Sequence, residues 1–366
     1  MPSHPWPLLL FLPLFACSNA RTHGQRTADR IASGTDTARD STPLAEYVVG
    51  AFEDSQGGLW FGTINSGVAH VVDGRLTFID STQGLPPNGG HGMVEAPDGT
   101  LWIAGHDGVF LHDPSRPGPL QVLHRSGATV RTDRSGHVWV STQGKVFRYT
   151  DASAPVEFVV PLPKELPTAY SIDPRKLVFQ LEDSRGRRWF GTDGHGAFCW
   201  DPVGAARGTG DPFTRYTKED GLCSNTPWSI VEDREGRIWF ACIQAFQPRE
   251  SGDGGLCVLD PSTPLGVGTF RTFPDVPGLH HNDLYTLYVD RDGALWSSAY
   301  KHGVYRYHNG RFTLFNTTDR PDLNGNFGLQ AMLQDRRGRY WMGFSGGLFT
   351  LEGDRLVHVP RGGPWE

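Results

Sequence analysis

One short motif, D-x-x-G-x-x-W, recurs along the sequence and constrains the fold more than any other feature. It stands at 54–60, 133–139, 183–189, 233–239, 290–296 and 335–341, and a degenerate copy, A-P-D-G-T-L-W, stands at 96–102. Asp favours the first position of a type I turn, and Gly tolerates the left-handed conformation that follows, so each copy predicts a tight β-hairpin. The Trp begins the second strand, and a small residue two positions later shares its face.

Two further strands follow each hairpin. After the sixth copy they read G-V-Y-R-Y-H (303–308) and R-F-T-L-F (311–315). Four antiparallel strands repeated seven times are typical of a β-propeller. We therefore predict an all-β fold, a seven-bladed β-propeller of four-stranded antiparallel blades over residues 45–360. Separate β-domains are the alternative, but no boundary in the sequence favours them. No strand is left over at either end, so we expect the first blade to pack directly against the last.

A second motif precedes several of the expected inner strands. It reads Q-G-L-P-P-N at 83–88, D-G-L-C-S-N at 220–225 and P-G-L-H-H-N at 277–282, with a looser D-L-N-G-N at 322–326. Together the two motifs resemble the two-component regulator propeller repeats of bacterial extracytoplasmic sensors, over about residues 45–360. In that family a membrane helix and a kinase usually follow the propeller. Because no such segment follows here, the resemblance implies recognition without kinase activity.

The N-terminus predicts export. An apolar stretch, W-P-L-L-L-F-L-P-L-F-A, runs up to Cys17 and has the length of a signal-peptide core. Because L-F-A-C resembles a lipobox, we expect a signal peptide over 1–17 and a lipid on Cys17; an ordinary secretory signal is the alternative. Residues 18–44 are small and polar and predict a flexible tether, and 361–366 form a C-terminal tail. The expected location is the periplasm or the outer-membrane surface.

Composition excludes several classes of protein. The chain has 46 Gly and 27 Pro in 366 residues, which disfavours a mostly helical fold. A net charge of −6 with 20% charged residues argues against an acidic disordered chain and against a basic nucleic-acid binder. We expect a monomer whose partner is a small molecule, a glycan or an envelope protein, and no nucleic acid.

The strand order predicts which loops share a face. Crossovers from an outer strand to the next inner strand emerge beside the hairpin loops that join second and third strands; we call this face the crossover rim. The candidate ligand-binding residues on it are Asn88, His91, His106, His195, Asn225, Trp228, His281, Asn282, Tyr285, Tyr300, His302 and Asn326.

Two groups among these candidates have open roles. The Asn of the second motif either caps a turn, which we favour, or contacts a ligand. His91, Trp228 and Tyr285 occupy one repeat-equivalent position, three residues after that Asn. Their rings either stack on a planar ligand at the mouth of the channel or fill space between blades.

The loop over 243–254 is longer than its counterparts, so Phe246 and Arg249 are placed to form a partial lid; an unordered insertion is the alternative. No pair of His residues has a recognised metal spacing, so we assign no metal and no cofactor. G-F-S-G-G at 343–347 matches a nucleophile motif but falls in a hairpin rather than a strand-to-helix elbow. No catalytic residue is assigned.

Four cysteines lie within the propeller: Cys199, Cys223, Cys242 and Cys257. An even number in an exported protein permits disulfides in three connectivities. Cys242 and Cys257 are expected on one face of adjacent strands, one pair out of register, which strains a bridge between them. Buried free thiols are the alternative.

The leading hypothesis is a tethered, non-catalytic recognition propeller that feeds a signalling system. The second is a lyase or hydrolase that works from the same rim with His195 or His302 as base. The third is a structural interaction module of the envelope.

Overall fold

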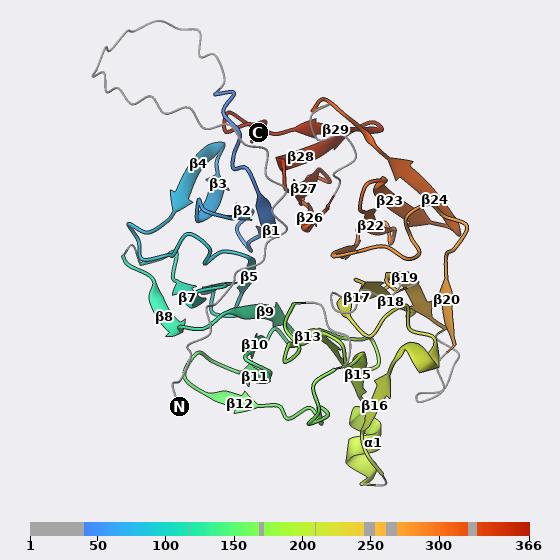
Figure 1. Cartoon of the computed structure of the whole chain (residues 1–366). Coiled ribbons are helices and arrows are strands. Elements are labelled where there is room, and N and C mark those ends of the chain that lie inside the picture. The colour runs from blue at the N-terminus through green and yellow to red at the C-terminus, as the bar shows by residue number, and fades with distance from the viewer. Residues whose placement is uncertain are drawn as a thin grey trace, which may run out of the picture. The chain divides into compact units, whose positions relative to one another are not determined.

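The computed structural model describes residues 40–366, except 117, 168–171, 209, 245–252, 261–268 and 321–327. Within these ranges, seven sheets surround a common axis (Figure 1), which confirms the seven-bladed β-propeller. Residues 39–366 form one compact unit. The expected signal peptide, Cys17 and most of the expected tether lie outside the described residues.

Blades one to four follow one another in chain order, each from its inner to its outer strand. Blade one contains β1 (Val48–Glu53), β2 (Leu59–Thr63), β3 (Val68–Val72) and β4 (Arg75–Ile79). Blade two contains β5 (Gly92–Glu95), β6 (Leu101–Gly105), β7 (Gly108–His112) and β8 (Gln121–His124). Blade three contains β9 (Ala128–Thr132), β10 (Val138–Thr142), β11 (Lys145–Tyr149) and β12 (Pro155–Glu157). Blade four contains β13 (Leu177–Glu182), β14 (Arg188–Thr192), β15 (Ala197–Trp200) and β16 (Phe213–Tyr216).

The remaining blades repeat this order. Blade five contains β17 (Pro227–Glu232), β18 (Ile238–Cys242), β19 (Gly255–Leu259) and β20 (Phe270–Thr272). Blade six contains β21 (Leu287–Val289), β22 (Leu295–Ala299), β23 (Gly303–His308) and β24 (Arg311–Phe315). Blade seven contains β26 (Ala331–Gln334), β27 (Tyr340–Phe344), β28 (Gly347–Glu352) and β29 (Arg355–His358), with the two-residue β25 (Thr317–Thr318) parallel to β29. This fifth strand was not expected; it covers part of the outer edge that β29 would otherwise expose.

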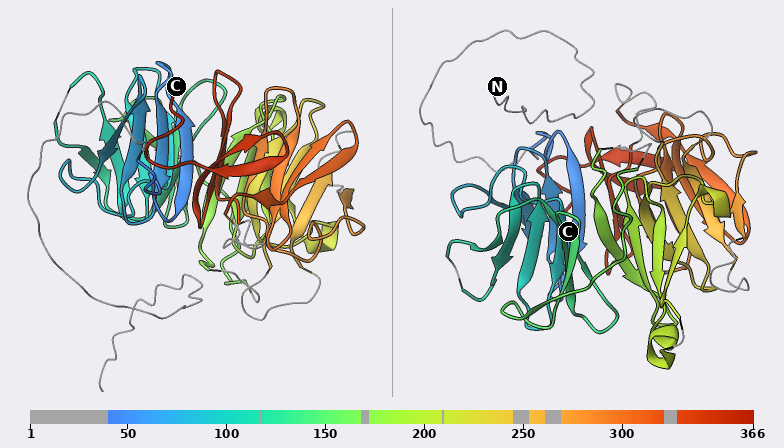
Figure 2. Two further views of the ribbon diagram at one scale, coloured as in Figure 1. Left: turned by 90° about the horizontal axis from the view of Figure 1, so that it is seen from above. Right: turned by 60° about the horizontal axis from the view of Figure 1, so that its bottom comes forward.

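Helical structure is a minor part of the described chain. Between β15 and β16 lies α1 (Pro202–Arg207), which extends away from the blades (Figure 2). It begins where the Asp201 side chain accepts the backbone N–H of Val203 and ends at Gly208, whose φ is +62°. A short 3-10 turn, η1 (Lys218–Asp220), precedes blade five.

The Asp of the repeated motif holds the Trp as well as the turn. In blade three, one carboxylate oxygen of Asp133 accepts the backbone N–H groups of Ser135 and His137, each at 3.0 Å. The other oxygen accepts the indole N–H of Trp139 at 3.0 Å. The same indole bond, of 2.6–3.0 Å, occurs in six blades: Asp54–Trp60, Asp133–Trp139, Asp183–Trp189, Asp233–Trp239, Asp290–Trp296 and Asp335–Trp341.

The small residue two positions after each Trp lies where the next blade's inner strand passes. A Cβ on Gly191 would stand 2.7 Å from the carbonyl oxygen of Pro227. Ser at this position instead bonds to that strand: the Ser141 hydroxyl accepts the backbone N–H of Phe179 at 3.0 Å, and Ser298 accepts that of Leu329 at the same distance. The repeated pattern is therefore a requirement of blade-to-blade packing.

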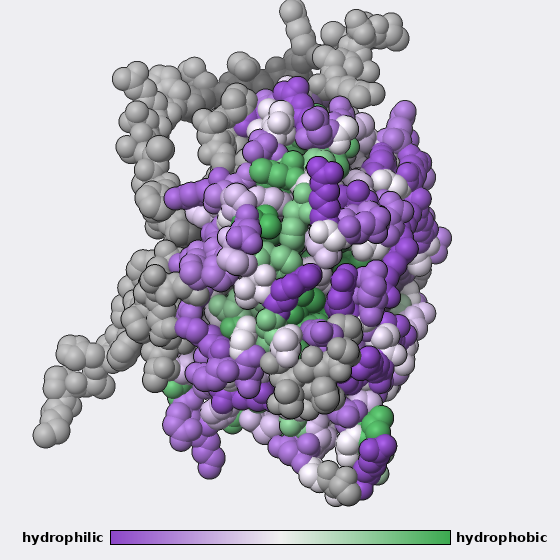
Figure 3. Space-filling view, turned by 90° about the vertical axis from the view of Figure 1, so that its right-hand side faces the viewer, coloured by the Kyte–Doolittle hydropathy of each residue, from purple (hydrophilic) through white to green (hydrophobic). Residues whose placement is uncertain are grey.

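The hydrophobic core lies between adjacent blades. Every motif Trp is at most 2% exposed and packs in such a cluster. The cluster between blades one and seven includes Val48, Trp341 and Trp365. Figure 3 shows the side of the molecule that carries β20 and β24, which is mainly hydrophilic around a strip of hydrophobic residues. Most apolar surface is thus used to join the blades.

Candidate ligand-binding rim

Crossovers and hairpin loops meet on one rim, as expected from the strand order. The side-chain oxygen of Asn88, in the crossover to blade two, accepts the backbone N–H of Asn65 in a hairpin loop of blade one. Its carbonyl oxygen accepts the backbone N–H of His106 in a loop of blade two. The carbonyl oxygen of Asn225 likewise accepts the N–H groups of Gly194 and Gly196. Each crossover is thereby fixed to neighbouring hairpins.

The motif Asn side chains hold loop backbone. The Asn225 side chain accepts the N–H of Lys218 at 2.9 Å. The Asn282 amide donates to the carbonyl oxygens of Gly278 and Tyr300 at 3.0 and 3.1 Å. These bonds agree with the turn-capping interpretation. Asn326, the fourth candidate of this kind, lies outside the described residues.

A polar pocket of about 350 Å³ opens on this rim between blades five and six. It brings together four of the predicted residues, His281, Asn282, Tyr300 and His302. Gln244, Gly278, His280, Asp283 and Lys301 complete its lining. The rings of His280 and His281 lie 3.7 Å apart, and burial followed by repulsion from His281 lowers the pKa of His280. The pocket is suited to hydrogen bonding with a polar ligand.

A second group of side chains lies where the inner strands of blades four to six begin. Trp228, in β17, and Tyr285, just before β21, meet edge to face with ring centroids 6.1 Å apart. The amine of Lys176, immediately before β13, lies 2.9 Å from the centroid of the Trp228 ring. Two of the three predicted rings therefore come together, with a cation that the sequence analysis did not single out.

The electrostatic surroundings of Lys176 are mixed. Desolvation lowers the pKa of Lys176 to about 7, although the carboxylates of Asp193 and Asp173 favour its charged form. The guanidinium of Arg131 acts in the same direction as desolvation. Asp193 is itself fully buried and accepts the backbone N–H of Asp173 at 2.8 Å. Near neutral pH, Lys176 is thus present both as an amine and as an ammonium, and an anionic neighbour would stabilise the ammonium form.

The other predicted histidines are placed differently. His91 meets His106 edge to face at 4.4 Å rather than joining Trp228 and Tyr285. Burial, and then His106, lowers the pKa of His91 to about 4, so its ring is neutral at neutral pH. His195 is only 7% exposed, and its carbonyl oxygen accepts the Arg215 guanidinium N–H at 2.7 Å. The predicted lid residues Phe246 and Arg249 lie outside the described residues.

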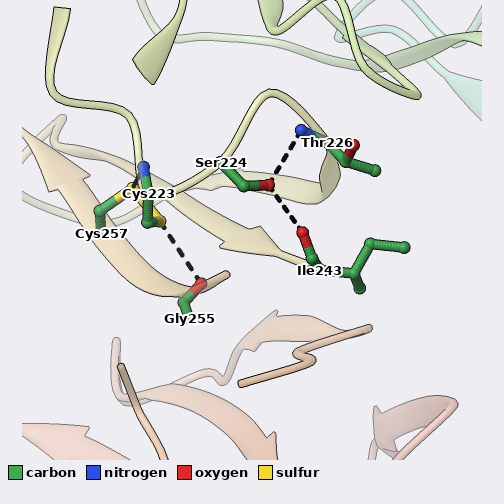
Figure 4. Close-up of a disulfide and its surroundings, with 6 residues drawn as sticks. All are labelled: Cys223, Ser224, Thr226, Ile243, Gly255 and Cys257. Carbon is green, nitrogen blue, oxygen red and sulfur yellow. Dashed lines mark hydrogen bonds between the residues drawn. A yellow bond between two sulfur atoms is a disulfide. The ribbon is translucent and has the colours of Figure 1, made fainter. Parts of the chain in front are cut away.

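The cysteines of blade five lie together below this rim. Cys223, in the crossover to blade five, forms a disulfide with Cys257 of β19 (Figure 4), with Cα atoms 6.0 Å apart. Cys242 pairs with Gly255 and Cys257 with Phe240, so the offset expected between Cys242 and Cys257 is confirmed. Cys242 and Cys199 are buried free thiols. The hydroxyl of Ser224 bridges this corner by donating to the carbonyl oxygen of Ile243 and accepting the N–H of Thr226 (Figure 4).

Comparison with known proteins identifies the repeat. The sequence model described as "Two component regulator propeller" matches residues 43–65 and 221–244, which span motif copies in blades one and five. Two stretches of the chain, in blades one and five, therefore match the two-component regulator propeller repeat. A search of curated proteins found no match to the sequence.

Several solved structures resemble this propeller in fold. The extracellular domain assigned to a hybrid two-component system of B. thetaiotaomicron aligns with TM-score 0.63 and 20% identity over 87% of the chain, and the chain spans 40% of that protein's length. A GH74 xyloglucanase from Xanthomonas campestris aligns with TM-score 0.62 and 14% identity; the alignment covers 89% of this chain and 55% of the xyloglucanase chain. Virginiamycin B lyase from Staphylococcus aureus aligns with TM-score 0.57 and 12% identity, over 84% of this chain and 95% of the lyase chain. At these identities the likeness concerns the fold.

The described part of the chain contains no helix with the length and apolar character needed to cross a bilayer.

Proposed function

We propose that this chain is an exported, lipid-tethered recognition propeller that binds its ligand on the crossover rim and passes the event to a signalling partner. The observation that carries the proposal is the cluster of Lys176, Trp228 and Tyr285 at the inner-strand ends. An aromatic pair supplies a flat apolar platform, and the amine attracts negative charge. The polar pocket between blades five and six adds hydrogen-bonding groups on the same rim.

This combination favours one class of ligand. A small molecule or glycan with a planar or pyranose face and a carboxylate would stack on Trp228 and pair with Lys176. Export and tethering rest on the apolar stretch that ends at Cys17, and they agree with the extracellular setting of the hybrid two-component domain of similar fold. The signalling role rests on the repeat family.

The test is a binding screen of the full chain. Neutral and acidic oligosaccharides are compared by thermal shift and by quenching of tryptophan fluorescence. A ligand at 100 times its Kd should add about 2.7 kcal/mol to the free energy of unfolding. We expect acidic ligands to bind more tightly than neutral analogues, and Trp228→Ala and Lys176→Met to weaken that binding at least tenfold.

Lys145→Met provides the matched control. Lys145 is the first residue of β11 in blade three, but its amine pairs with Glu157 of the outer strand at 3.2 Å, so binding should be unchanged. Equal binding by the Trp228→Ala variant would remove the proposed site. Capture of an envelope protein, with no response to any small ligand, would favour a structural module.

A second candidate is an enzyme that works in the pocket between blades five and six. His280, His281, His302 and Asp283 line that pocket together, which places acid–base groups around one space. Mass spectrometry of the same ligands after incubation distinguishes the two functions. A new product that disappears with His302→Ala would establish the enzyme; unchanged ligands would favour recognition alone.

A further inference from the structure

Three cysteine sulfurs converge inside blade five. The Sγ atoms of Cys223, Cys242 and Cys257 all lie within 4.8 Å of one another, and the three side chains are buried. They come from three separate segments: the crossover before β17, the end of β18 and the middle of β19. Within the described residues this is the one such group of potential metal ligands. The disulfide uses two of these sulfurs and leaves the third beside it.

A backbone donor is directed at one of these sulfurs. The N–H of Cys223 donates to the Sγ of Cys257 at 3.3 Å. A hydrogen bond of this kind stabilises charge on a buried sulfur. Burial raises the pKa of the neighbouring Cys242 thiol to about 12, so a cation that binds there must displace its proton.

The crossover segment that contains Cys223 and Ser224 is fixed by further contacts. Ser224 is tied to Ile243 and Thr226 at 2.7 and 3.0 Å, and the Cys223 sulfur lies 3.5 Å from the carbonyl oxygen of Gly255 (Figure 4). The crossover is therefore anchored independently of the disulfide. Cleavage of the disulfide would leave the three sulfurs close together.

We propose that the reduced protein binds one soft metal cation through Cys223, Cys242 and Cys257, and that the Cys223–Cys257 disulfide closes this site. Thiolates select soft or borderline d¹⁰ cations such as Cu(I) and Zn(II). The three sulfurs are near enough for one such ion to contact all of them after small adjustments. None of the three cysteines lines the pocket on the rim, and the site does not depend on the proposed recognition function.

A dithiol reductant can open the disulfide and free its two sulfurs. One dithiol gives two electrons and two protons to the Cys223–Cys257 bond and becomes a disulfide, which leaves three thiols in the cluster. Metal binding then forms three metal–sulfur bonds and releases three protons. A small-molecule disulfide would reverse the process: it takes up two electrons and two protons and becomes two thiols, the Cys223–Cys257 bond re-forms, Cys242 regains its proton and the ion is released.

Cadmium alone is the probe. The full chain is reduced with an excess of dithiol, freed of reductant without oxygen and titrated with Cd²⁺, while sulfur-to-cadmium charge-transfer absorption and bound metal are measured. We expect one Cd²⁺ per reduced chain and none per oxidised chain. Cys242→Ser should weaken binding at least tenfold, whereas Cys199→Ser, a change to the buried thiol outside the cluster, should not alter it.

Several results would overturn the site. These are equal binding by reduced and oxidised chains, equal binding by Cys242→Ser and the unaltered chain, or no binding by the reduced chain. Circular dichroism of each sample establishes whether the blades remain folded. A Cys242→Ser variant that is folded but binds Cd²⁺ normally would assign any binding to Cys223 and Cys257 alone, and a reduced chain that unfolds without binding would also count against the proposal.

Discussion

The motif carboxylates illustrate how single residues depend on one another. Each motif Asp has an Arg or His neighbour, which comes from one of two positions in the repeat. In blades four, five and seven it is the fifth motif residue: Arg187, Arg237 or Arg339. In blades three and six it comes from the third strand, opposite the Trp: Arg148 or Arg306. In blade one it is His70, which stacks on Trp60 at 3.6 Å.

Blade two lacks both partners. Ala96 stands in place of Asp, Thr100 is the fifth motif residue, and Leu111 lies opposite Trp102. Carboxylate and cation are thus absent together. The electrostatics explain this, because burial opposes ionisation of Asp133 while hydrogen bonds from Trp139 and Arg148 outweigh it and lower the carboxyl pKa. A buried charge without its partner would destabilise the blade.

We expect two substitutions that restore this carboxylate and cation in blade two to have non-additive effects on the free energy of unfolding. Ala96→Asp and Leu111→Arg should each lower the free energy of unfolding by about 1–3 kcal/mol, because each buries an unpaired charge. The double variant should recover at least about 1 kcal/mol of the summed loss. Urea unfolding of the four proteins measures this coupling. Ala96→Asp with Leu314→Arg, a distant exposed site in blade six, is the control and should be additive; additivity of the first pair would refute the argument.

At four junctions, neighbouring blades are joined by a repeated hydrogen-bonded clasp at the end of an inner strand. In blade five, the carboxylate of Glu232 accepts the backbone N–H and the hydroxyl of Ser184 in blade four at 2.8 and 2.5 Å. It also pairs with Arg134 of blade three at 3.1 Å. The same N–H acceptor role is taken by Glu95, Gln334 and Glu53 toward Ser55, Arg291 and Arg336. Four junctions between blades therefore share one hydrogen-bonding pattern.

Removing one clasp should weaken a whole junction. Glu232→Ala should lower the free energy of unfolding by about 1–3 kcal/mol, because its side chain is 8% exposed and its loss leaves the Ser184 N–H without its acceptor. The control is Glu157→Ala, which removes an exposed pair with Lys145 and should cost less than about 1 kcal/mol. Chemical denaturation measures both. Equal losses would mean that the clasp adds nothing beyond an ordinary surface contact.

Local patterns explain how far the sequence could predict these elements. The turns, the strand order and the offset between Cys242 and Cys257 follow from residues near one another in the chain, so they were predictable. The Ser184–Glu232 clasp joins residues 48 positions apart, and only the angle between blades brings them together. Lys176 was missed for the same reason, since its blade lacks the second motif and its partner Trp228 belongs to the next blade.

Closure of the ring depends on both ends of the propeller. Arg336 of blade seven reaches Glu53 of blade one through the same clasp. The C-terminal tail then crosses the junction, where the N–H of Arg361 donates to the carbonyl oxygen of Thr42 at 2.8 Å. Trp365 stacks on Trp341 with centroids 5.7 Å apart. The sequence predicts a C-terminal tail over 361–366, although Trp365 was the available signal for a packing role.

The tail should therefore stabilise closure specifically. Trp365 is 8% exposed and also lies 6.2 Å from the ring of Phe61 in blade one, so Trp365→Ala should lower the free energy of unfolding by about 3 kcal/mol. Native-state hydrogen exchange should show lost protection first in β1 and β27, because Val48 of β1 and Trp341 of β27 pack in the cluster at the junction. Trp200→Ala, at the end of β15, should instead lower the exchange protection of the strands of blade four. Unchanged stability, or loss of protection spread evenly over all seven blades, would show that the ring closes without the tail.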